Sequence, residues 1–92
     1  MKDLEGKYKI AEGIYSQNIG DETVLLDMNG EEYFGLNEVG SIIWKLLQDG
    51  CDLKYIHREL SEKFECESEI IAADLKELIS ILLEKKLILS SE

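Results

Sequence analysis

The stretch EEYFGLNEVGSIIWKLL, residues 31–47, changes character in its middle. Its first part alternates and is aromatic, which is typical of a β-strand. Its second part repeats apolar residues at helical spacing, and Asn37 between the two parts is a favoured helix N-cap. The sequence therefore predicts a strand that passes directly into a helix, with Asn37 as the joint.

Two further strands are predicted upstream, and the three together form the simplest antiparallel meander. GIYSQNI begins at Gly13 and is followed by a turn at residues 20–22 and by TVLLDM. The pair Asn29-Gly30 then gives a strong hairpin signal, because both residue types accept a positive φ. Residues 1–9 are charged and without pattern, so we expect a loose N-terminal arm or a strand added late.

Both faces of this meander are apolar. A two-residue turn places Leu25 opposite Phe34 and Leu26 opposite Tyr33, and residues opposite each other share a face. A three-residue loop would shift every pair by one. One face must pack on helices, and the other must be covered by the N-terminal arm, by another chain or by a ligand.

Three helices follow the meander, each with an apolar stripe. Their expected limits are from Asn37 to Asp49-Gly50, from Asp52 to about Phe64, and from about Ser68 to about Lys86. The closing LILS, residues 87–90, is a short strand or a C-terminal docking segment. This order predicts an α+β, winged-helix-like fold: a three-stranded antiparallel meander followed by three helices, the last two forming a helix-turn-helix pair.

The third helix carries a second set of residues on one flank of its core stripe. At about 100° per residue this flank gathers Ile70, Asp74, Glu77 and Ile81. The two isoleucines are not needed by the main core. The flank is therefore either part of a wide core face or one wall of an apolar groove with acidic residues along it.

Composition limits what the chain can do. Its 92 residues suffice for one domain, residues 1–92, and 20 acidic against 10 basic residues give a net charge of −10, which repels nucleic acid and anionic membranes. Without a membrane-span run or a signal-peptide core, we expect a cytoplasmic protein. Cys51 and Cys66 form no CxxC pair and His57 is the only histidine, so we expect no metal site and no cofactor.

The sequence contains no GxGxxG, GxxxxGK[ST], HExxH or GxSxG motif, so we do not expect an enzyme, and two binding functions compete. A winged helix-turn-helix regulator would read DNA with the third helix, but that helix is more acidic than basic. Peptide binding by strand addition would use the free edge of the third strand, EYFGL. Gly35 leaves room for close backbone approach there, and the flank of the third helix supplies a pocket wall.

The segment LLDMNGEEYFGLNEVGSIIWKLL, residues 25–47, resembles the PqqD family, in which a strand pair with an aromatic "YxGLN" end leads into a helix of the "vGxxIW" kind. Downstream, ECESEIIAADLKELISILLEKKLI, residues 65–88, is similar to that family's last helix, with its acid and its closing "LI". The resemblance runs from about Gly13 to Leu89. It departs at the turn, where the family usually has its Gly one place after Gly30.

This resemblance implies a RiPP recognition element, a small domain that binds the leader region of a ribosomally made precursor peptide and delivers it to a modifying enzyme or leader protease. The leader is expected as an added strand beside the third strand, which carries Glu32, Tyr33, Phe34, Gly35 and Leu36. Asp74 is the matching acid of the family's last helix, and Leu78 and Ile81 would line the groove. Free-standing members serve lasso peptide pathways or radical SAM pathways such as that for pyrroloquinoline quinone. The precursor, the partner enzyme and the choice between a monomer and an edge-paired dimer stay open.

Overall fold

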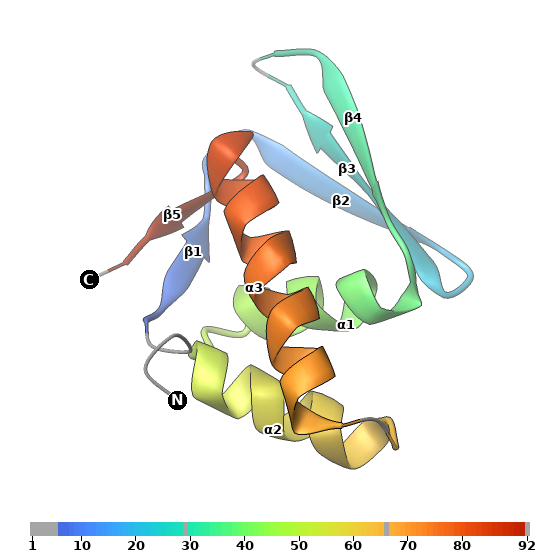
Figure 1. Cartoon of the computed structure of the whole chain (residues 1–92). Coiled ribbons are helices and arrows are strands. Elements are labelled where there is room, and N and C mark those ends of the chain that lie inside the picture. Colours follow the sequence, from blue (N-terminus) through green and yellow to red (C-terminus); the bar gives the residue numbers. More distant parts are fainter. Residues whose placement is uncertain (1–5, 29, 66, 92) are drawn as a thin grey trace.

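The computed structural model describes residues 6–28, 30–65 and 67–91, which are arranged as shown in Figure 1. The elements follow in the order β1 (Tyr8–Ile10), β2 (Ile14–Ile19), β3 (Glu22–Asp27), β4 (Glu32–Leu36), α1 (Glu38–Gln48), α2 (Leu53–Lys63), α3 (Ser68–Glu84) and β5 (Ile88–Ser90). The antiparallel sheet β2-β3-β4 and the three helices after it confirm the predicted α+β, winged-helix-like fold.

The predicted register of the β3–β4 hairpin is confirmed, but its turn is not the expected one. Leu25 lies opposite Phe34, and the pairing ends at Asp27 opposite Glu32, so the loop spans residues 28–31. Gly30 does not have a positive φ, whereas Glu31 has a φ of 56°. The side chain of Asp27 accepts a hydrogen bond from the Gly30 N–H at 3.2 Å, which favours this wider loop. Asn29 lies outside the described residues.

β1 and β5 pair with each other in a separate two-stranded sheet, with Ile10 opposite Ile88. Of the two expectations for residues 1–9, a loose arm or a strand added late, the structure shows the strand for Tyr8 and Lys9, while residues 1–5 lie outside the described part of the chain. Ile10 packs against the core beside Ile88, which is 1% exposed. Burial of apolar surface thus stabilises a pairing between the two ends of the chain.

The joint between β4 and α1 has the predicted cap. Asn37 accepts a hydrogen bond from the Gly40 N–H at 2.8 Å through its side-chain oxygen. A Cβ atom at Gly40 would lie 3.3 Å from Cβ and Cδ2 of Leu36, so a larger residue there would press on a buried side chain. The first turn of α1 therefore sits tightly against the end of β4.

The core lies between the inner face of the sheet and the three helices. Leu25 and Leu36 point from the sheet into a cluster that is filled mainly from α1, α2 and α3. The outer face carries Tyr15 and Tyr33, which are 63% and 76% exposed. Among the described residues the N-terminal arm does not cover this face, because β1 pairs with β5 instead.

Candidate functional site

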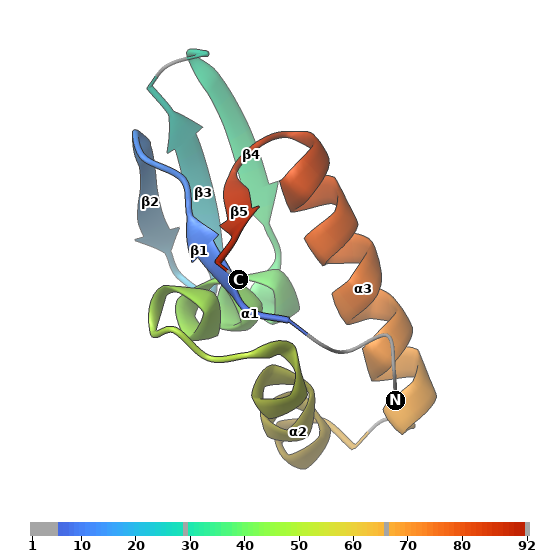
Figure 2. The ribbon, with the colours of Figure 1, turned by 90° about the vertical axis from the view of Figure 1, so that its left-hand side faces the viewer.

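A groove of about 330 Å³ lies between the β4–α1 joint and α3. Figure 2 shows β4 and α3 side by side, with the start of α1 below them. Both walls contribute apolar and polar side chains, and α3 adds two acidic ones. The lining residues are Phe34, Gly35, Leu36, Asn37, Val39, Gly40, Ile43, Asp74, Glu77, Leu78 and Ile81.

The structure brings six of the eight predicted site residues together in this groove: Phe34, Gly35, Leu36, Asp74, Leu78 and Ile81. Glu32 and Tyr33 lie outside it. They line a much smaller hollow, of about 30 Å³, with Lys85 and Leu87. Lys85 Nζ lies 5.7 Å from the centroid of the Phe34 ring, a cation–π contact beside this smaller hollow.

β4 forms one margin of the sheet, and the hydrogen-bond pattern fixes which of its main-chain groups point outward. Met28 donates its N–H to the Gly13 carbonyl at 3.0 Å, so alternate residues of β3, including Leu26 and Val24, bond to β2. Their opposite residues on β4, Tyr33 and Gly35, therefore turn their N–H and C=O groups away from β3.

The side chains of β4 alternate between the two faces of the sheet. Phe34 and Leu36 share the inner face with Leu25 and reach the groove. Tyr33 points to the outer face and is 76% exposed, so it offers the groove side only its main chain. An open row of donors and acceptors thus runs directly beside a partly apolar hollow.

Comparison with known proteins shows one matching family and two similar solved structures. The family model described as "Coenzyme PQQ synthesis protein D (PqqD)" matches residues 22–88. The chain belongs to the PqqD family. No curated protein sequence matches it significantly.

Two solved structures are similar to this PqqD-family chain. One, of TbiB1 in complex with the TbiA(beta) leader peptide, shares 34% sequence identity with a TM-score of 0.83 and covers 87% of this chain and 93% of its own. The other, of a lasso peptide synthetase B1 complexed with the leader peptide, shares 25% identity with a TM-score of 0.83 and covers 90% and 98%.

Sequence reasoning about this PqqD-family chain missed the part of the groove that comes from α1. Asn37, Val39, Gly40 and Ile43 line it, and Val39 and Ile43 belong to the apolar stripe of that helix, which by periodicity alone indicates only a core face. The N-cap at Asn37 was the available signal, because a helix that starts immediately after a strand must place its first turn at the end of that strand. Glu77 also lines the groove, as its position on the flank of the third helix had suggested.

A second hollow, of about 100 Å³, continues the groove toward the end of α2. It shares Val39, Ile43 and Asp74 with the groove. Its remaining lining is apolar and comes from α2 and α3: Leu60, Phe64, Ile70, Ile71 and Leu75. Ile70, which the sequence analysis placed on the flank of the third helix, is accordingly 53% exposed at this end.

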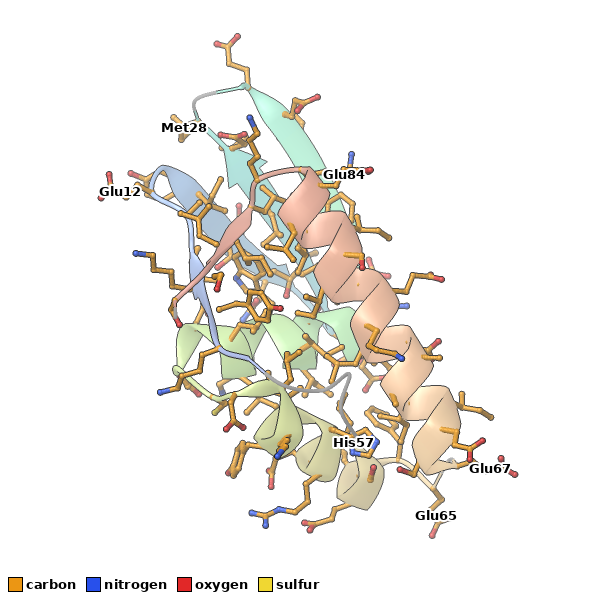
Figure 3. The ribbon with its side chains drawn as sticks, turned by 60° about the vertical axis from the view of Figure 1, so that its left-hand side comes forward. Glu12, Met28, His57, Glu65, Glu67 and Glu84 are labelled. Carbon is orange, nitrogen blue, oxygen red and sulfur yellow. The ribbon has the colours of Figure 1, made fainter. Side chains whose placement is uncertain are left out.

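The electrostatics of this PqqD-family chain favour a neutral or basic ligand. Asp74 and Glu77 are exposed along the groove, and α3 carries four acidic residues (Glu69, Asp74, Glu77 and Glu84) against one lysine, Lys76. Figure 3 labels Glu84 at one end of this helix and Glu67, its N-cap, at the other. Within the described residues there is no cluster that could hold a metal ion and no helix long and apolar enough to cross a membrane.

Proposed function

We propose that this chain recognises the leader region of a ribosomally made precursor peptide, by adding an extended segment of that leader to the free edge of β4. The observation that carries the proposal is the juxtaposition of the open edge and the groove: the outward main-chain groups of Tyr33 and Gly35 lie directly beside the hollow walled by α3. Strand addition requires such an edge for main-chain bonds and adjacent pockets for alternate side chains. Two similar structures with leader peptides bound support it.

The groove favours leader side chains of particular kinds. Residues of the added strand that face inward would meet the apolar side chains of Phe34, Leu78 and Ile81. A basic or hydrogen-bonding group of the leader would meet Asp74, beside Glu77. Leucine or aromatic anchors contribute about 1.5–3 kcal/mol each when fully buried, and each main-chain bond about 0.5–1.5 kcal/mol net. After the cost of ordering the peptide, micromolar to nanomolar affinities follow.

The role of the chain in this proposal is to deliver the leader, without catalysis of its own, to an enzyme that processes or modifies the precursor. A lasso peptide pathway, with its leader protease as partner, is favoured over a radical SAM pathway. The support is the likeness to a lasso peptide synthetase B1 at 25% identity over 98% of that chain. DNA binding is disfavoured because a duplex would face the acidic surface of α3.

The test is fluorescence polarisation of the purified chain against the labelled leader half of a precursor peptide encoded beside it. A scrambled leader and a labelled DNA duplex serve as controls. We expect saturable binding of the leader and no binding of either control. Equal binding of leader and scrambled leader, or binding of DNA alone, would overturn the proposal.

A further inference from the structure

The other margin of the sheet, β2, is also open. Figure 2 shows it at the end of the sheet away from α3, with no ribbon beyond it. Since alternate residues of β3 bond to β4, their opposite residues Ile14, Ser16 and Asn18 turn their main-chain groups outward. The β2–β3 turn agrees with this hydrogen-bond pattern. It is a two-residue loop that starts at Gly20, which has a φ of 65°, and the two residues that flank it, Ile19 and Glu22, lie opposite each other.

β2 lacks the features by which proteins normally protect an edge strand. Its sequence, IYSQNI, has no charged residue and no proline, although one third of the whole chain is charged. Lysines, prolines and bulges are the usual means of preventing edge-to-edge pairing. Tyr15 and Ile19 are also 63% and 59% exposed on its outer face. A strand of this kind is suited to pair with another strand.

The sequence of β2 is complementary to itself when two copies run antiparallel about a two-fold axis. In such a pair, residues whose main-chain groups point outward must lie opposite one another, so that they can form hydrogen bonds across the seam. A register with Gln17 on the two-fold axis, opposite Gln17 of the second copy, meets this requirement. Tyr15 of each copy then lies opposite Ile19 of the other, and Ser16 opposite Asn18. Aromatic–β-branched pairs of this type stabilise antiparallel sheets.

We propose that β2 is a self-association edge, through which a second copy of this chain pairs antiparallel with the first. The pairing joins two three-stranded sheets into one and leaves both β4 edges open at its margins. A second copy is favoured over a peptide ligand because the hollow beside β2 is polar and charged, lined among others by Glu22, Glu38 and Lys45. Such a hollow offers no apolar pocket for the anchors of an added peptide.

Charge limits this association in a way that can be measured. Each copy carries a net charge of −10, so two copies that pair along β2 repel each other. Repulsion between like net charges opposes association, and salt screens it. The dimer is therefore expected to strengthen as ionic strength rises, whereas an association between opposite charges would weaken.

The experiment is sedimentation velocity of the full chain over a dilution series at low and at moderate salt. We expect a monomer–dimer equilibrium whose dissociation constant falls with salt. Ser16→Pro removes an outward N–H, and Ile19→Lys adds a charge at the paired edge; each should weaken the dimer by about tenfold or more. Leu89→Lys, the same kind of change at a 44% exposed site on β5, is the matched control and should dimerise like the parent.

Three outcomes would overturn the proposal: a monomer at every concentration and salt, a dimer unaffected by both β2 variants while circular dichroism shows them folded, or a dimer that weakens with salt. Leader binding by the same variants separates this inference from the proposed function. Ser16→Pro should bind leader like the parent, and a loss of leader binding there would mean that β2 is the peptide edge instead. A chain that dimerises but binds no leader would overturn the proposed function alone.

Discussion

The two margins of the sheet, β2 and β4, have the same main-chain character and different surroundings. Each presents alternate N–H and C=O groups that bond to no neighbouring strand within the described residues. Beside β4 stand α3 and the first turn of α1, which form a groove with apolar walls and two acidic side chains. Beside β2 the hollow is polar. An open edge alone therefore does not define a peptide site, and the side chains next to it decide which partner it accepts.

The largest effect should come from blocking the β4 edge itself. Tyr33→Pro removes an outward main-chain donor and leaves a carbonyl of the bound leader unpaired, at a cost of about 1–3 kcal/mol. We expect leader affinity to fall by about 5- to 150-fold in the polarisation assay. The matched control is Ser16→Pro, the equivalent change at the other margin, which should leave leader affinity unchanged. Equal losses in both variants would show that the two edges do not differ as proposed.

A smaller effect is expected from the wall of the groove. Ile81 is half-buried in it, and Ile81→Ala removes apolar surface that the leader would cover, worth about 1 kcal/mol at partial burial. Leader affinity should fall by about fivefold. Leu83→Ala on the same helix, at a 38% exposed site that does not line the groove, is the control for changes in α3 itself. If Leu83→Ala weakens binding as much as Ile81→Ala, the groove is not the site.

The sequence predicted the features that local chemistry determines. Asn37 and Asp52 cap the first two helices as expected, and the pairing of Leu25 with Phe34 follows from the alternation of apolar residues. The flank of the third helix was also predictable, since Asp74 and Ile81 follow from helical spacing alone. The identity of the two edge strands, β2 and β4, follows from the meander order of the three strands.

Long-range packing could not be predicted in the same way. The pairing of Tyr8 with Ser90 joins the two ends of the chain, and no local pattern indicates it. Val39 and Ile43 belong to an apolar helical stripe, and only the angle between α1 and α3 decides that they also face the groove. Periodicity gives the face of a helix, whereas the partner of that face depends on how the helices pack.

The smallest effect concerns the two hairpin tips that bound these edges. The β2–β3 tip has a glycine, Gly20, at its residue of positive φ, whereas the β3–β4 tip has Glu31 there, with a φ of 56°. A non-glycine residue in this left-handed region costs roughly 1–2 kcal/mol, partly offset by the entropy that glycine loses on folding. The resemblance to the PqqD family implies a glycine at this same position, one place after Gly30. Glu31→Gly should therefore raise the free energy of unfolding by about 0.5–1 kcal/mol.

Urea denaturation measures this gain as a higher midpoint with an unchanged slope. Glu31→Gln is the matched control, because it removes the same negative charge from a chain of net charge −10 but keeps a side chain in the left-handed region. If Glu31→Gln stabilises the fold as much as Glu31→Gly, the gain comes from relief of charge repulsion, and conformational strain is not what distinguishes the β4 tip. If only Glu31→Gly stabilises it, the tip that leads into the peptide edge holds strain that the Gly20 tip does not.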